Sequence, residues 1–197
     1  MSHRLSTPKG EFIIRPAVVE DAAALRELRL EALANHPEAF AADYTATAAG
    51  STETWVERIT EYARENQGVI CVAATFHGEA GSDPGESRLV GMLGLFREHW
   101  PKTRHSGTIW GVYVKEEWRG FRLAEALIDE CIAWAQAQGL RIVKLGVNTA
   151  NTPAIRCYAR CGFTVYGIDP QVIFYNGVFY DELLMAKPIG SPSLEVG

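Results

Sequence analysis

Two arginines and a glycine lie in a short turn between a predicted strand and a predicted helix, where they suit an anion. The turn reads Arg119-Gly120-Phe121-Arg122-Leu123-Ala124. The first N–H groups of a helix have no partner within the helix, and the helix dipole attracts negative charge to them. Gly120 lets the backbone approach a ligand, and the two guanidinium groups suit phosphate. On this segment alone, a tight turn with two solvated arginines remains an equal alternative.

A second polar pair follows on the next predicted helix. Asn151 and Tyr158 are seven residues apart, nearly two helical turns, so they share a face with Ile155. Taken separately, Asn151 is a helix cap and Tyr158 is a core residue whose hydroxyl finds a partner. No GxGxxG fingerprint and no Walker A loop is present, so neither motif indicates a dinucleotide or nucleotide-triphosphate fold.

The four cysteines are Cys71, Cys131, Cys157 and Cys161, and they form neither a CxxC pair nor a zinc-finger spacing. Cys157 and Cys161 share a helix face, so a bridge or metal there is a lesser alternative to apolar packing. We therefore expect no metal. The absence of a secretory signal and of a disulfide pattern favours a cytoplasmic protein.

Length and charge limit the remaining classes. The chain has 197 residues, with 19 Lys and Arg against 24 Asp and Glu, which suits one domain. Its mild acidity predicts no broad attraction for nucleic acid or anionic lipid, and no apolar run is long enough to span a bilayer. We expect a single domain over residues 11–187, a flexible N-terminus over 1–10 and a flexible tail over 188–197.

Hydrophobic periodicity supplies the elements that must position these residues. Helical periods predict helices over 20–36, 51–66, 121–138 and 152–161. Alternation and β-formers predict strands over 11–16, 69–76, 89–96, 107–115, 140–147 and 163–166, and a hairpin over 172–185. A turn-rich loop is expected over 78–87.

The lengths of the connections predict how these strands pair. The three central strands have no crossover helix between them and should form an antiparallel meander, whereas the helix over 121–138 connects two strands that should run parallel. The fold class is therefore α+β (mixed α/β), with helices on the faces of a mixed sheet.

Together, the two segments resemble the GCN5-related N-acetyltransferases, the GNAT superfamily. The family's Q/R-x-x-G-x-G/A pattern at the acetyl-CoA pyrophosphate is matched by Arg119 and Ala124, but Arg122 stands where the family has glycine. The later N-x-x-A-x-x-x-Y-x-x-x-G-F pattern is matched at Asn151, Ala154, Tyr158, Gly162 and Phe163. The order of elements resembles the family from about Phe12 to Lys187.

The resemblance implies an acetyl-CoA-dependent N-acetyltransferase with a central, twisted, mostly antiparallel mixed sheet. Pantetheine would lie between strands 107–115 and 140–147 and pair with the backbone of Val112 and Val114. The pyrophosphate would lie on the N–H groups from Phe121 through Arg122 and Leu123 to Ala124, and Asn151 would contact the cofactor. Tyr158 matches the family's general acid, which protonates the departing CoA thiolate. Homodimers are frequent in the family.

The implied reaction also needs a base, because an alkyl amine with a pKa of about 10 is mostly protonated at pH 7. The candidates are Glu98, His105, Glu116 and Asp181, or a water chain. The acceptor is expected to be a small-molecule or peptide amine. The alternative function is a non-catalytic acyl-CoA-binding or regulatory module, favoured by Arg122 in the glycine position and by the absence of an evident base.

Overall fold

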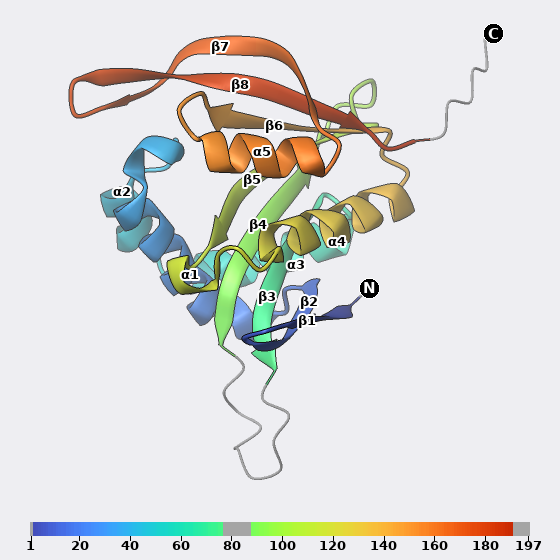
Figure 1. Cartoon of the computed structure of the whole chain (residues 1–197). Helices are drawn as coiled ribbons and strands as arrows, with labels where there is room; N and C mark the ends of the chain where they lie inside the picture. The colour runs from blue at the N-terminus through green and yellow to red at the C-terminus, as the bar shows by residue number, and fades with distance from the viewer. Residues whose placement is uncertain (1, 77–87, 191–197) are drawn as a thin grey trace, which may run out of the picture.

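The computed structural model describes residues 2–76 and 88–190, which form an eight-stranded sheet with helices packed against it (Figure 1). The strands are β1 (His3–Thr7), β2 (Gly10–Pro16), β3 (Gly68–Phe76), β4 (Leu89–Arg97), β5 (Ser106–Val114), β6 (Ile142–Asn148), β7 (Thr164–Tyr175) and β8 (Val178–Pro188). The helices are α1 (Ala22–Asn35), α2 (Tyr44–Ala49), α3 (Glu53–Glu65), α4 (Leu123–Ala137) and α5 (Thr152–Arg160). Short 3₁₀ turns are η1 (Val19–Asp21), η2 (Pro37–Ala39) and η3 (Glu116–Trp118).

The sheet is mixed but mostly antiparallel, as predicted. Its strand order is β1-β2-β3-β4-β5-β6-β8-β7, and β5 with β6 is the parallel pair. β3, β4 and β5 form the predicted meander, and α4 is the crossover that makes β5 and β6 parallel. The parallel pair joins two antiparallel parts of the sheet, one from β1 to β5 and the other from β6 to β7.

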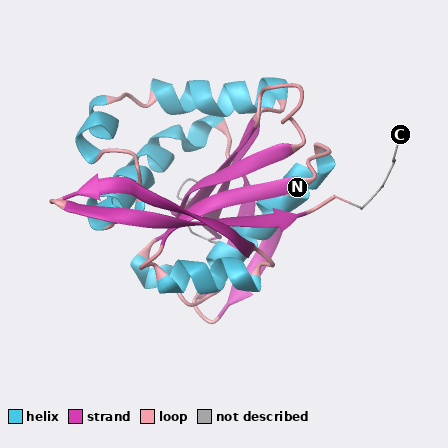
Figure 2. Ribbon diagram, turned by 90° about the horizontal axis from the view of Figure 1, so that it is seen from above, coloured by secondary structure: helices cyan, strands magenta, loops and turns pink. Residues whose placement is uncertain are grey.

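Helices cover both faces of the sheet (Figure 2). On one face, α4 buries an apolar stripe that includes Leu127, Ile128 and Cys131 against the strands, and α5 packs beside it. On the other face, α1 and α3 bury Leu25 and Trp55 against a second apolar cluster. The long apolar strands are explained by this arrangement, because a strand that is covered on both faces needs apolar residues at nearly every position.

Three segments differ from the sequence expectation. Within residues 1–10, expected to be loose, His3–Thr7 forms β1 and pairs with β2, and Leu5 packs against the core. The helix α2 was not predicted; Asp43 caps it by accepting a hydrogen bond from the Ala46 N–H. Strand β7 continues beyond the predicted 163–166 through a register shift between Asp169 and Ile173. The loop predicted over 78–87 and the tail beyond residue 190 lie outside the described residues.

The β7–β8 hairpin exposes a large apolar surface at the edge of the sheet (Figure 1). Its turn is the predicted Asn176-Gly177, and both residues have positive φ. The exposed apolar side chains are Val165, Tyr166, Ile168, Val172, Phe174, Tyr175, Val178 and Phe179. A patch of this kind is typical of an interaction surface, and the homodimer stays a prediction.

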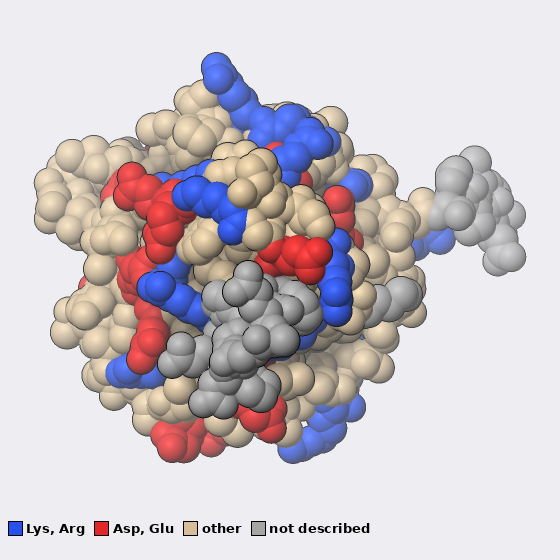
Figure 3. All heavy atoms as spheres, turned by 60° about the horizontal axis from the view of Figure 1, so that its bottom comes forward, with Lys and Arg blue, Asp and Glu red and all other residues tan. Residues whose placement is uncertain are grey.

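Surface charge and helix length bear on the two classes that composition disfavours, proteins that bind polyanions broadly and proteins that span a membrane. On the face seen in Figure 3, Lys and Arg are interspersed with Asp and Glu. Within residues 2–76 and 88–190, none of the helices has the length and apolar character required to cross a membrane.

Gly94 on β4 fixes how a large aromatic residue lies on the sheet. A Cβ atom at Gly94 would collide with the indole ring of Trp110 on β5, so the missing side chain is what admits that ring. We predict that Gly94→Ala lowers the free energy of unfolding by about 1–3 kcal/mol through overpacking. Urea denaturation measures the change. Gly167→Ala is the control, because its Cβ would meet only ordinary contacts, and equal losses in both variants would contradict the explanation.

Candidate functional site

Strands β5 and β6 separate after a short stretch of pairing. Ser106–Thr108 pair with Ile142–Lys144, and beyond them the two strands diverge. A cavity of about 770 Å³ opens in the gap, within the usual range for small-molecule sites. It is lined by residues 109–114 of β5, residues 145–148 of β6, the starts of α4 and α5, and the η2 segment.

A bulge in β5 causes part of this divergence. Met92 on β4 pairs with Tyr113 and Gly94 pairs with Trp110, so Gly111 and Val112 together oppose one residue of β4. Gly111 has a φ of 64°, a value that glycine adopts without strain. A bulge bends its strand and increases the local twist, which turns β5 away from β6. Val112, within the bulge, and Val114, just after it, both line the cavity.

The turn before α4 places helical N–H groups at the cavity. Gly120 and Arg122 have φ values of 84° and 62°, and the helix begins at Leu123. The first hydrogen bond back to this turn runs from the Ala126 N–H to the Arg122 carbonyl, which leaves the earlier N–H groups without a helical partner. The left-handed conformation of Arg122 explains why glycine is common at this position in the pattern. The geometry is that of an anion site.

Arg119 is used differently from the sequence expectation. Its Nε donates to the Val114 carbonyl oxygen at 3.0 Å, and its Nη2 lies 2.9 Å from Nε2 of His36. The guanidinium also lies over the ring of Tyr113. Arg119 therefore ties the turn to β5 and to the end of α1 rather than extending freely toward a phosphate.

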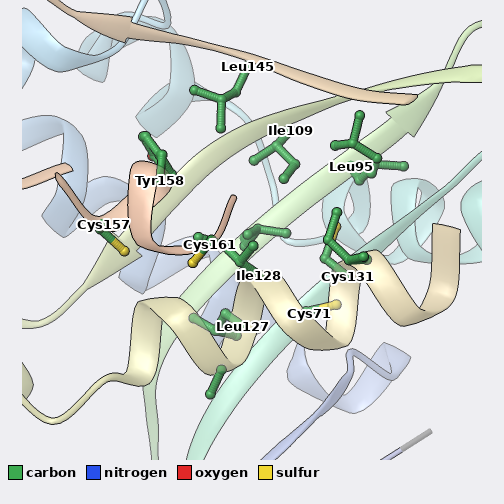
Figure 4. Close-up of a cluster of buried hydrophobic side chains, with 14 of the residues drawn as sticks. Cys71, Leu95, Ile109, Leu127, Ile128, Cys131, Leu145, Cys157, Tyr158 and Cys161 are labelled. Atoms are coloured by element: carbon green, nitrogen blue, oxygen red, sulfur yellow. The ribbon is translucent and has the colours of Figure 1, made fainter. Parts of the chain in front are cut away.

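Helix α5 brings the predicted polar pair to the same cavity. Asn151 caps the helix, with its Oδ1 accepting from the Ala154 N–H at 3.2 Å, and both Asn151 and Tyr158 line the cavity. Tyr158 is 7% exposed and packs edge-on against Phe163, and burial raises its pKa above the usual value. Figure 4 shows it beside Cys157 at the edge of the buried cluster. The hydroxyl therefore stays protonated through the neutral range.

The four cysteines have free, buried thiols. Cys157 lines the cavity; its hydrogen bond with Cys161 raises its own pKa and lowers the pKa of Cys161. A search of the described ranges finds no group of three His, Cys, Asp or Glu residues able to hold a metal. The four thiols therefore pack among the apolar side chains of the core.

None of the four candidate bases borders the cavity. Glu98 and His105 lie at the far end of the β4–β5 hairpin, where the Glu98 N–H donates to the Ser106 carbonyl. Glu116 lies on η3, and Asp181 accepts a hydrogen bond from the Gln171 N–H. Glu98 and His105 therefore lie at the opposite end of β5 from the gap, whereas Glu116 follows the end at which the gap opens.

Sequence reasoning missed the wall formed by residues 36–40. The Asn148 side chain donates to the Glu38 carbonyl oxygen at 2.9 Å, which joins η2 to β6 across the cavity. His36 and Phe40 line it from the same segment. Only the Pro37 helix stop marks this segment in the sequence, and a helix stop carries no information about a distant contact.

Comparison with known proteins agrees with this geometry. The profile of the acetyltransferase (GNAT) family matches residues 36–163. The L-amino acid N-acetyltransferase AaaT of Escherichia coli K12 is 26% identical over 180 residues, covering 90% of this chain and 98% of that protein. The crystal structure of a GNAT-family acetyltransferase from Streptococcus pneumoniae superposes with a TM-score of 0.76 at 25% identity, covering 91% of this chain and 99% of that one.

A further solved structure contains the donor. The putative acetyltransferase yncA from Salmonella typhimurium, solved with its cofactor acetyl-CoA, has a TM-score of 0.74 at 22% identity and covers 91% of this chain and 95% of that chain. The chain belongs to the acetyltransferase (GNAT) family. It is an N-acetyltransferase with acetyl-CoA as donor, as expected.

The left-handed conformation of Arg122 gives a stability prediction. That conformation costs a non-glycine residue roughly 1–2 kcal/mol, while glycine adds unfolded-state freedom of about 0.4–1 kcal/mol. We expect the free energy of unfolding of Arg122→Gly to lie within about 1 kcal/mol of the wild-type value. Arg122→Val should be clearly less stable, because a β-branched residue resists positive φ. Thermal and urea unfolding measure both.

Arg156 is the matched control, because it is exposed in the ordinary helical backbone of α5. At position 156 the order of stability reverses, and Arg156→Gly should be less stable than Arg156→Val. The same order at both positions would show that strain at Arg122 is unimportant.

Proposed function

We propose that an amine acceptor attacks the acetyl thioester directly in the cavity, and that Tyr158 gives its proton to the departing CoA thiolate. The observation that supports this most is that the Tyr158 side chain lines the same cavity as the bulged end of β5 and the start of α4. Burial keeps the phenol neutral, so its proton is available at pH 7.

The donor fits backbone groups at the end of β5 and the start of α4. We propose that Val112 and Val114 pair with the pantetheine amides, since a strand edge offers both donors and acceptors. The pyrophosphate is assigned to the N–H groups of Phe121, Arg122, Leu123 and Ala124, and Gly120 allows its close approach. Asn151 contacts the donor from α5. Arg119 positions the turn, through its bonds to Val114 and His36.

The proposed reaction forms a C–N bond at the acetyl carbon and breaks its C–S bond. The neutral amine forms a C–N bond with the acetyl carbonyl carbon, whose oxygen becomes an oxyanion beside a strand N–H near Val114. The oxyanion collapses, the C–S bond breaks and sulfur takes the Tyr158 proton, while the acylated nitrogen loses its extra proton, which returns the phenolate to its neutral form directly or through water. We further propose that residues 11–187 act as one catalytic domain. The four free thiols suit a reducing cytoplasm.

The role of Tyr158 is tested by Tyr158→Phe, which removes one oxygen from a buried ring. We expect kcat to fall by about 100-fold, because a positioned acid contributes at least that much, while the KM for acetyl-CoA stays within a few-fold. Thiol release measured with an accepting amine gives both constants.

Tyr175→Phe on the exposed turn of the hairpin is the control for loss of a tyrosine hydroxyl. Normal turnover by Tyr158→Phe would remove Tyr158 from the mechanism. A rise in the KM for acetyl-CoA without a fall in kcat would assign it to binding instead.

The charge of Arg122 is tested with two variants that tolerate positive φ, Arg122→Gly and Arg122→Asn. If the guanidinium contacts phosphate, both weaken CoA binding by about 10-fold and reduce its salt dependence. Calorimetry at two salt concentrations measures this, and Arg64→Asn on α3 controls for net charge. Unchanged affinity would exclude a phosphate contact, and tighter binding by Arg122→Gly would show that the side chain obstructs the site.

A further inference from the structure

A buried arginine without a partner lies directly behind one wall of the cavity. Arg29 on α1 is 8% exposed, and its Nη1 has no hydrogen-bond partner among the described residues. Its guanidinium stacks on Phe40, 4.6 Å from the ring centroid, and Nη1 lies 3.4 Å from the position that a Cβ atom on Gly111 would occupy. Both Phe40 and Gly111 line the cavity, and Arg29 lies behind them.

The surroundings of Arg29 increase the need for an anion. Burial, and then the nearby charge of Arg58, lowers the pKa of Arg29 to about 10. Other buried or half-buried arginines are satisfied: Arg15 is paired with Asp21 at 2.6 Å, and Arg26 donates to the carbonyl oxygens of Gly50 and Ala48. Unsatisfied buried polar groups in native proteins are few and often belong to functional sites.

A carboxylate, that of Glu182 on β8, lies against Gly146 of β6 on the other side of the gap. The Glu182 side chain on β8 occupies the space where Gly146 would carry a Cβ, and Gly146 also lines the cavity. No hydrogen bond or ion pair of Glu182 is found within the described part of the chain. Burial, followed by the charge of Asp169, raises the pKa of Glu182.

The two charges stand at the same level of the gap. The β5–β6 register pairs Thr108 with Lys144, and its continuation places Trp110 opposite Gly146, with Gly111 next along β5. A cation and an anion therefore face the divergence from opposite strands, each beside a glycine. Arg29 comes from α1, which packs on one face of the sheet, whereas Leu123 at the start of α4 and Tyr158 on α5 belong to the cluster on the other face.

We propose that the acceptor is a small zwitterion carrying a primary amine and a carboxylate, as an α-amino acid does. Arg29 binds the carboxylate beside Gly111, where the missing side chain leaves room for the contact, and Glu182 accepts a proton from the ammonium group. The amine lone pair then attacks the acetyl carbon, and the proton on Glu182 passes to solvent. This inference rests on the proposed function and names its acceptor and its base.

The carboxylate half is tested with Arg29→Met. For L-amino acids kcat/KM should fall by about 30-fold or more, as expected when a buried charge-assisted contact is lost, while the KM for acetyl-CoA is unchanged. The melting temperature should be unchanged or higher, because no protein group loses a partner. Arg26→Met is the matched control from one turn earlier in α1. It should lower the melting temperature, because two carbonyl oxygens lose their donor, and leave acceptor preference unaltered.

The base half is tested by pH profiles of Glu182→Gln and Asp169→Asn. Glu182→Gln should reduce kcat by about 100-fold and abolish the acid limb that the wild type shows. Asp169→Asn should move that limb to lower pH, because removing the like charge lowers the pKa of Glu182. The other titratable groups on elements packed against β8 at this level are Lys144, Tyr180 and Glu38. An acid limb that stays in place in both variants would overturn the role of Glu182.

An acceptor panel separates failure of this inference from failure of the proposed function. The twenty standard L-amino acids are compared, and the best of them with its carboxamide and its decarboxylated amine. Preference for the acid that disappears in Arg29→Met supports the inference. Equal rates for acid, amide and amine, unaffected by Arg29→Met, overturn it and leave acetyl transfer intact. Absence of thiol release with every amine overturns both.

Discussion

The separation of β5 from β6 is the constraint on which the site depends. Three pairs of residues hold the strands together at one end, and beyond them each strand has backbone groups facing a cavity instead of its neighbour. Such groups must be satisfied by water or by a ligand with amides of its own. The other strand pairs of the sheet are antiparallel, and α4 and α5 pack over the parallel pair, so the gap is held open by a well-packed frame.

Unusual backbone conformations are concentrated at this gap. Gly111 forms the bulge that bends β5, and Gly120 and Arg122 take positive φ immediately before α4. Glycine makes two of these positions easy, whereas Arg122 retains strain of roughly 1–2 kcal/mol. Strain of this kind persists where the surroundings fix it, and here the buried Leu123 on one side and the Trp118–Phe12 contact on the other hold the turn.

Local signals made much of the fold and the donor side predictable. The anion turn, the Asn151–Tyr158 face and the Asn176-Gly177 hairpin each depend on residues within about two helical turns, where spacing determines geometry. β1 was not predicted, because an edge strand is stabilised by pairing with its neighbour, here β2, and not by its own composition. The wall at His36 and Phe40, and the charges at Arg29 and Glu182, depend on contacts between distant segments, which a single sequence does not reveal. The candidate bases stay predictions, because nearness to a central strand does not specify which side chain reaches the reacting amine.

Donor and acceptor groups reach the gap from opposite faces of the sheet. The helix start and Tyr158 lie on the side of α4 and α5, whereas Arg29 belongs to α1 on the other side. If, as we propose, the two substrates enter from opposite faces, they can meet only where the sheet is interrupted, at the divergence of β5 and β6. This geometry suits direct transfer between two bound molecules. It also explains why the chain tolerates an unpaired buried cation: pairing Arg29 within the protein would stabilise the fold but would remove the charge that an anionic acceptor needs.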